Sequence, residues 1–216
     1  FTKDMNIPIK LFEEPYFTSR MNLYDTAFDT KRKFDMFLET LSHFETEQDY
    51  FAAYNKLKDD VINYLRSQEA MERFMQEDLN SDTFKLKNTN FPKHDIFKRT
   101  FDGKFFVSID MKKANFTALR HYDSSIVGGK NSYEEFIGMF TDFEYFKQSK
   151  YIRQVVFGNC NPKRQVAYQK RLMDEFLTCL LTFTVENQIV FFSNDEIVVD
   201  VSELSEVERK FYSTAV

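Results

Sequence analysis

The stretch that decides the fold of the C-terminal half is Asn187-Gln188-Ile189-Val190-Phe191-Phe192-Ser193-Asn194-Asp195-Glu196-Ile197-Val198-Val199-Asp200-Val201. Two apolar runs, 189–192 and 197–201, flank four polar residues. Val, Ile and Phe suit a pleated, half-buried surface, and Asn and Asp tolerate the backbone of a tight turn. The pattern predicts a β-hairpin with Asp195 and Glu196 at or beside its turn. Such a carboxylate pair can hold a divalent cation, and the alternative is an ordinary hairpin with a solvated acidic turn.

A second strand is predicted upstream of this hairpin. Asp102-Gly103 indicates a turn, and Lys104 to Ile109 is a short apolar run that ends on Asp110. The next residues, 111–122, have a helical pattern. A carboxylate at the end of a strand is held on rigid backbone at the edge of the sheet. The alternative is that Asp110 only caps the following helix.

The composition indicates a globular chain with many helices. Its 216 residues allow one large domain or two small ones, and 26 of them are Phe, whereas Gly numbers 5 and Pro 4. Cys160 and Cys179 form no disulfide framework or zinc pattern, so we expect reduced thiols and a cytoplasmic protein. No apolar run approaches the roughly 20 residues that span a bilayer, so no membrane partner is expected. Because the net charge is −5, the chain would bind nucleic acid only through a local basic patch.

Periodicity predicts helices over most of the remaining chain. An edge strand is predicted at Thr83 to Lys87. The expected fold class is α+β: a helical N-terminal half packed on a small antiparallel sheet with helices on one face. The expected domains are a helical one, 1–95, and an α+β one, 96–216, with a basic helical insertion. The predicted helices are about 23–41, 47–77, 132–140, 142–157, 162–183 and 202–212.

Residues 150 to 173 form a basic region in this acidic chain. Six cationic residues occur there without one Asp or Glu: Lys150, Arg153, Lys163, Arg164, Lys170 and Arg171. Such a region can contact the phosphates of a nucleotide or of a nucleic-acid backbone. The alternative is a solvated helix face that balances acidic neighbours.

Three short motifs, taken in order, resemble the palm of template-dependent nucleic-acid polymerases. Val107-Ser108-Ile109-Asp110 looks like motif A, and Asn194-Asp195-Glu196-Ile197-Val198 looks like motif C. Between them, Arg153-Gln154-Val155-Val156-Phe157-Gly158 is similar to a triphosphate-binding segment of the fingers. Family-A enzymes and single-subunit RNA polymerases look closest, and reverse transcriptases come second. His-Asp-Glu is usual in the family, and Asn194 stands in place of that His.

The resemblance implies a two-metal nucleotidyltransferase or polymerase module, or a fragment of one. It implies that Asp110 and Asp195 bind Mg²⁺ (or Mn²⁺), with Glu196 as a further catalytic carboxylate. Arg153, Lys163 and Arg164 would bind the triphosphate. The implied partners are nucleic acid and a nucleoside triphosphate, with further protein subunits.

The alternative function is a non-catalytic interaction or structural protein, of viral origin, with a degenerate palm-like fold. A viral protein would be located in the host cytoplasm or a virus factory. A large exposed aromatic patch on residues 23 to 77 would favour this alternative.

Overall fold

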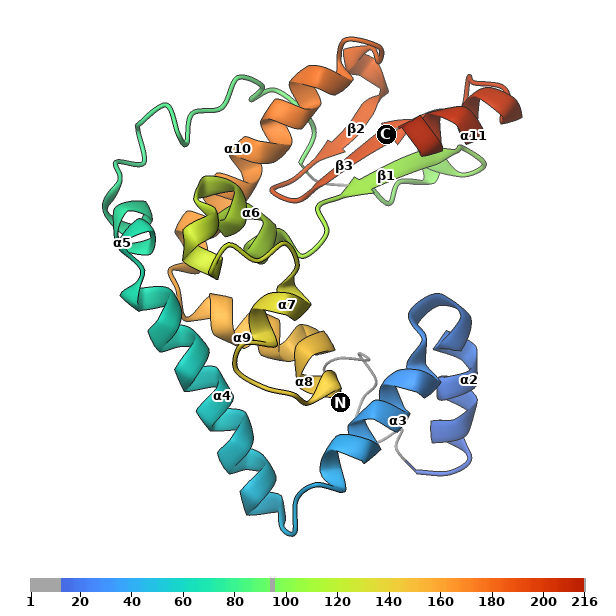
Figure 1. The fold of residues 1–216 in the computed structure, drawn as a ribbon. Coiled ribbons are helices and arrows are strands. Elements are labelled where there is room, and N and C mark those ends of the chain that lie inside the picture. Colours follow the sequence, from blue (N-terminus) through green and yellow to red (C-terminus); the bar gives the residue numbers. More distant parts are fainter. Residues whose placement is uncertain (1–12, 94–95, 216) are drawn as a thin grey trace. The chain divides into compact units, whose positions relative to one another are not determined.

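The computed structural model describes residues 13–93 and 96–215, and it has an α+β fold, as predicted. Helices make up most of the chain, and the sheet has three antiparallel strands (Figure 1). Contacts group the chain into two compact units, each built from two separate segments. Unit 1 contains residues 1–72 and 124–161, and unit 2 contains residues 73–123 and 162–216. The domain division at residue 95 stays a prediction.

Unit 1 consists of helices that are shorter than the sequence predicted. The first predicted helix begins earlier and is split at Asp29, which has φ 53°. The second is interrupted at Gln68, which is extended, and the fourth at Ser149. The helices are α2 (Tyr16–Phe28), α3 (Thr30–Leu41), α4 (Glu47–Ser67), α5 (Glu69–Gln76, shared with unit 2), α7 (Tyr133–Ile137), α8 (Glu144–Gln148) and α9 (Lys150–Gly158).

Local side-chain bonds define where several of these helices begin. Thr46 and Asp49 form a reciprocal capping box at the start of α4. Ser132 and Ser149 cap α7 and α9 through their hydroxyl groups. Within unit 1, α4 packs against α9 and α3 against α8. The buried face of α4 is lined by Leu57, Val61, Ile62 and Leu65.

Unit 2 contains the sheet, whose strand order is β1-β3-β2. The hairpin is confirmed: β2 (Ile189–Phe192) pairs with β3 (Glu196–Asp200). The strand β1 (Phe106–Asp110) is also confirmed, and it pairs with β3 from the other side. The central strand is therefore the one that comes last in the sequence.

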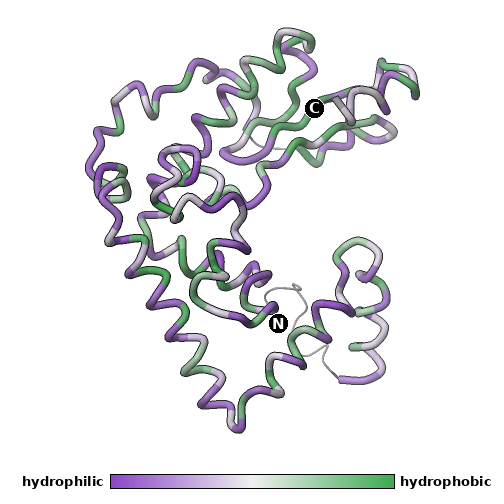
Figure 2. Tube along the Cα trace, viewed as in Figure 1, coloured by the Kyte–Doolittle hydropathy of each residue, from purple (hydrophilic) through white to green (hydrophobic). Residues whose placement is uncertain are grey.

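The helix α10 (Pro162–Leu180) covers one face of this sheet (Figure 1). The core between them contains Met173, Leu177, Leu180, Ile189, Phe192, Ile197, Val199 and Val201. Hydrophobic residues dominate the strands, whereas hydrophobic and polar residues alternate along α10 (Figure 2). The helix α6 (Ala114–Tyr122) packs on α10. The terminal helix α11 (Glu206–Ala215) begins with a capping box of Ser205 and Glu208.

The predicted edge strand at Thr83 to Lys87 is wrong, because this segment forms turns and irregular backbone. The backbone amides of Lys87 and Asn88 donate to the carboxylate of Asp174 on α10, at 2.6 and 2.8 Å. Asp174 is 1% exposed. A buried carboxylate thus satisfies the amides that a neighbouring strand would otherwise bind.

No helix in residues 13–93 and 96–215 is long and apolar enough to cross a membrane. Cys160 and Cys179 are both free thiols, as expected. Burial raises the pKa of the Cys160 thiol, with a smaller opposing effect from Arg66.

Candidate functional site

The strand register brings two of the predicted carboxylates together. Asp110, the last residue of β1, lies directly opposite Glu196, the first residue of β3. Directly opposed residues of an antiparallel pair project to the same face with Cβ atoms about 5 Å apart. Asp110 is exposed and Glu196 is half-buried. These two side chains therefore share a solvent-accessible end of the sheet.

Asp195 lies in the turn of the hairpin and meets β1 through its backbone. The amide of Met111 donates to the carbonyl oxygen of Asp195 at 2.7 Å, which extends the β1–β3 pairing past Asp110. The Ser193 hydroxyl lies 3.2 Å from the Asp195 carboxylate, and it accepts from the amides of Asp195 and Glu196. Ser193 thus fixes the turn that carries both acidic residues.

Glu196 has a polar neighbour on β1. The Ser108 hydroxyl donates to Glu196 Oε1 at 2.6 Å. Ser108 precedes Asp110 by two residues, so the two side chains lie on the same face of β1. This bond holds the Glu196 carboxylate beside Asp110 and leaves further lone pairs on its oxygens for other partners.

A chain of side-chain amides connects the hairpin turn to α10 and α6. Gln169 is 2% exposed, and its Nε2 donates to Asn115 Oδ1 at 2.6 Å. Asn194 Nδ2 lies 3.4 Å from Gln169 Oε1. Asn115 belongs to the helix that follows Asp110, and Asn194 precedes Asp195. Gln169 therefore links the two segments that carry the candidate carboxylates.

Sequence reasoning missed Gln169, although its spacing contained a signal. Gln165, Gln169, Met173 and Leu177 recur every four residues and all are buried on one face of α10. Val166, one position from Gln165 on the same helix, is 43% exposed. Polar residues in register with an apolar face indicate a buried hydrogen-bonding role.

Lys170 provides a cation near the end of β2. Its Nζ lies 4.9 Å from the centre of the Phe192 ring, one residue before the turn begins. Burial lowers the pKa of Lys170, and the charge of Lys93 lowers it further. The sequence placed Lys170 in the basic region but gave it no role.

The residues predicted to bind triphosphate are divided between the two units. Arg153 is in unit 1, where its guanidinium lies 5.6 Å from the centre of the Tyr133 ring. Lys163 is exposed in the first turn of α10, in unit 2. Arg164 donates to the backbone carbonyl of Glu77 at 2.5 Å and lies over the Phe84 ring. Arg164 thus has a structural role within unit 2, and the triphosphate-binding roles stay predictions.

The candidate carboxylates offer some of the ligands that a metal centre requires. Among residues 13–93 and 96–215, no three His, Cys, Asp or Glu side chains are grouped so as to hold an ion. Mg²⁺ in nucleotide enzymes is typically bound by one or two carboxylates together with substrate phosphates and water. The opposed pair of Asp110 and Glu196 offers oxygen ligands of the kind that Mg²⁺ or Mn²⁺ prefers, so the residues fit such an ion.

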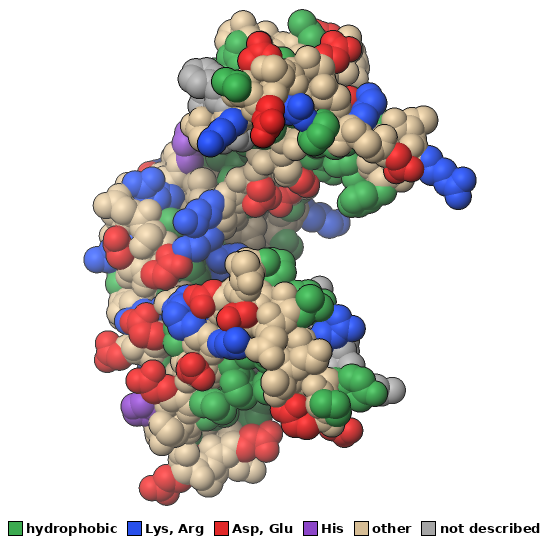
Figure 3. Space-filling view, turned by 90° about the vertical axis from the view of Figure 1, so that its right-hand side faces the viewer, with side chains coloured by type: hydrophobic (Ala, Val, Ile, Leu, Met, Phe, Trp, Pro, Cys, Tyr) green, Lys and Arg blue, Asp and Glu red, His purple; other side chains and the backbone are tan. Residues whose placement is uncertain are grey.

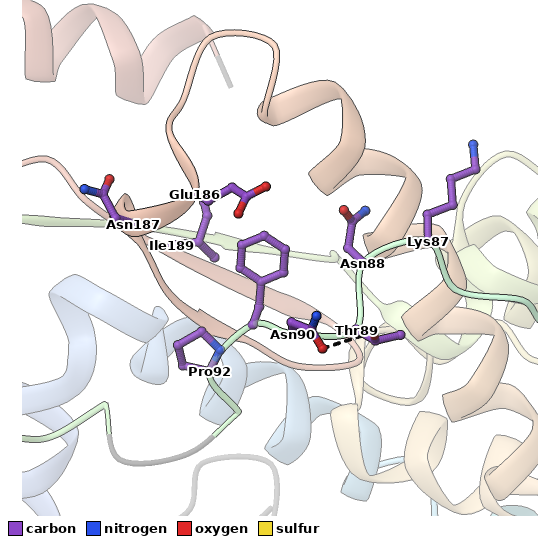
Figure 4. Close-up of a pocket in the computed structure, with 9 residues that line it drawn as sticks. Lys87, Asn88, Thr89, Asn90, Pro92, Glu186, Asn187 and Ile189 are labelled. Atoms are coloured by element: carbon purple, nitrogen blue, oxygen red, sulfur yellow. Dashed lines mark hydrogen bonds between the residues drawn. The ribbon is translucent and has the colours of Figure 1, made fainter.

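A cavity of about 570 Å³ lies at the other end of β2 from the turn. It is open to solvent and lined by residues of the segments 87–92 and 186–189 (Figure 4). The segment 87–92 also covers the edge of β2, since the amide of Phe192 donates to the carbonyl oxygen of Pro92 at 2.8 Å. Because Ile189 is at the start of β2 and Asp195 follows its end, this cavity is separate from the carboxylates.

Comparison of the chain with protein-family models, curated proteins and solved structures finds no match.

Proposed function

We propose that this chain is a palm-type nucleotidyltransferase or polymerase module that binds a divalent cation, a nucleoside triphosphate and nucleic acid. One observation carries the proposal: Asp110 and Glu196 lie opposite each other on adjacent antiparallel strands, with Asp195 in the adjoining turn. These strands are separated by more than eighty residues in the sequence. The resemblance of the two motifs predicts that they are neighbours.

The proposed division of labour follows the resemblance of the motifs. Asp110 and Asp195 bind Mg²⁺ or Mn²⁺, and Glu196, held by Ser108, is the further carboxylate. A metal at this place would activate the attacking hydroxyl and stabilise the leaving pyrophosphate. Lys170, at the hairpin, supplements Lys163 on the same helix as a cation for phosphate.

The test measures Mn²⁺ binding and nucleotide incorporation on the same protein. We expect the chain to bind Mn²⁺, as detected by loss of the free-ion signal in electron paramagnetic resonance. We also expect it to extend a primer annealed to a template. Asp110→Asn should lower Mn²⁺ affinity by about tenfold or more and abolish incorporation, because it removes a ligand charge.

Two further variants separate the roles of the hairpin carboxylates. If Asp195 is the ligand, Asp195→Asn weakens Mn²⁺ binding more than Glu196→Gln does. The matched control is Asp200→Asn, which removes the same charge from the far end of β3. Unchanged Mn²⁺ binding in Asp110→Asn, or no binding by the unaltered chain, contradicts the proposal.

A second candidate is a non-catalytic interaction module, which the surface of unit 1 favours. Large hydrophobic side chains on α2, α3 and α4 are exposed to solvent, among them Leu23 (63%), Phe28 (56%), Leu38 (47%) and Phe51 (49%). Exposed apolar groups of this size indicate contact with another molecule where they form one patch. This candidate expects Asp110→Asn to leave function unchanged. The Mn²⁺ and primer-extension measurements therefore discriminate the two functions.

A further inference from the structure

A cavity of about 450 Å³ lies between the end of α3 and the start of α4 in unit 1. It is lined by Phe37, Leu41, Phe44, Glu45, Thr46, Glu47, Tyr50 and Phe51. Its volume is within the range of sites that bind small ligands or single side chains. None of these residues belongs to the candidate site in unit 2.

Four aromatic rings line this cavity, those of Tyr50 and of its neighbours Phe37, Phe44 and Phe51. The centre of the Tyr50 ring lies 5.6 Å from that of Phe44, 5.5 Å from that of Phe51 and 6.3 Å from that of Phe37. These three rings are nearly perpendicular to Tyr50, with interplanar angles of 87°, 74° and 86°, and the ring of Phe146 on α8 lies 5.6 Å from Tyr50 at 55°. The face of an aromatic ring attracts cations.

The stretch of chain that lines the cavity carries only negative charge, whereas α8, which packs against α3, carries Lys147 in an ion pair with Glu144. Between residues 34 and 55 there is no Lys or Arg, whereas five acidic residues occur: Asp35, Glu39, Glu45, Glu47 and Asp49. Glu45 and Glu47 line the cavity itself, and both are exposed. Hydrophobic and acidic side chains lie next to one another on the surface in the lower part of Figure 3. Aromatic faces and a carboxylate rim both favour a cationic occupant.

The apolar surface continues beyond the cavity. Leu38, next to Phe37 in the sequence, is 47% exposed, and Phe51 at the rim is 49% exposed. A small cation would leave these side chains in water. A peptide with apolar residues beside its cation would cover them as well.

From these observations we infer that the cavity binds a basic, leucine-rich segment of a partner protein, with an Arg or Lys side chain between the aromatic rings. Arginine suits the site best, because its guanidinium stacks on aromatic faces and pairs with carboxylates. The inference rests on the second candidate function, and it needs neither a metal nor a nucleotide.

The test uses a fluorescein-labelled peptide of alternating leucine and arginine pairs, with fluorescence anisotropy as the readout. We expect the peptide to bind the full chain. Its affinity should fall as the salt concentration is raised, because the rim charges are solvent-exposed. Phe51→Ala and the double variant Glu45→Gln/Glu47→Gln should each reduce the affinity by about tenfold. Phe51 is half-exposed, so its truncation should leave the fold intact, which circular dichroism checks.

Matched controls decide whether the cavity is responsible. Phe97→Ala removes a side chain that is 99% exposed in unit 2, and Glu203→Gln removes an exposed charge there. Neither should change the affinity. Equal binding of a glutamate-for-arginine peptide, or equal losses in the controls, overturns the inference.

Other occupants would give different results. If tetramethylammonium binds and the peptide does not, the inference of a protein partner is overturned, and the occupant is a small cation. A concentration-dependent dimer in sedimentation experiments, lost in Phe51→Ala, would show that a second copy occupies the site. Failure of these tests leaves the Mn²⁺ and primer-extension results untouched, so the two proposals fail separately.

Discussion

At the scale of the residue, Tyr122 shows how burial and one hydrogen bond alter a titration. Its hydroxyl donates to Glu77 Oε2 at 2.8 Å. Burial raises the pKa of Tyr122 to about 12, and the bond to Glu77 and its charge add to the effect. Because the folded protein holds the neutral form, this contribution to stability is complete below pH 10. It is lost as the pH rises from 10 to about 12.

Tyr122→Phe should remove this pH dependence. The difference in unfolding free energy between the native chain and Tyr122→Phe is therefore expected to shrink above pH 10. Denaturant unfolding at several pH values measures this difference, and the ultraviolet absorbance of phenolate follows the titration itself. A constant difference across the range would show that Tyr122 is not held neutral by its surroundings.

Asp174 gives a prediction about stability. Its buried carboxylate accepts the amides of Lys87 and Asn88. Asp174→Ala leaves these amides without that acceptor and should reduce the free energy of unfolding by about 2–4 kcal/mol. The control is Asp82→Ala, whose side chain is 99% exposed, and a change within about 0.5 kcal/mol is expected there. Chemical denaturation of the two variants tests both values.

At the scale of the element, the sequence predicted most helices and all three strands but not the breaks in the helices. Asp29, Gln68 and Ser149 interrupt patterns of apolar residues that continue on both sides, so periodicity alone does not reveal them. The register of Asp110 against Glu196 also lay beyond sequence reasoning. It depends on two strands far apart in the chain, and the hydrophobic pattern of each does not identify its partner.

The segment between β1 and α6 allows a prediction at this scale. Lys113 has φ 53°, a left-handed conformation that costs a residue with a side chain about 1–2 kcal/mol. Lys113→Gly should therefore stabilise the chain by about 0.5–1 kcal/mol, after the added freedom of the unfolded state is subtracted. Lys112→Gly, at the adjacent residue, should be neutral or destabilising. Thermal unfolding that ranks the two variants in the opposite order would contradict this account.

At the scale of the whole molecule, unit 1 depends on contacts between its two separate segments. Gly128 has φ +63°, and a Cβ added there would lie 2.9 Å from the Tyr64 hydroxyl on α4. Gly129 has φ +68° with open space around it. Gly128→Ala should cost about 2–4 kcal/mol, from backbone strain and overpacking, and Gly129→Ala only about 1–2 kcal/mol of strain.

A double-mutant cycle with Tyr64→Phe tests this contact directly. Removing the hydroxyl should reduce the penalty of Gly128→Ala and leave that of Gly129→Ala unchanged. Equal penalties for the two glycines would show that α4 does not restrict the segment around residue 128.

The position of β3 in the middle of the sheet has a consequence for synthesis on the ribosome. The strands β1 and β2 do not pair with each other. Each pairs with β3, which is translated after both of them. Unit 1 has all its residues once position 161 has emerged, whereas the sheet of unit 2 must wait for residues 196–200. We therefore expect unit 1 to fold first on the nascent chain, while β1 stays unpaired and exposed to chaperones over about ninety residues of translation.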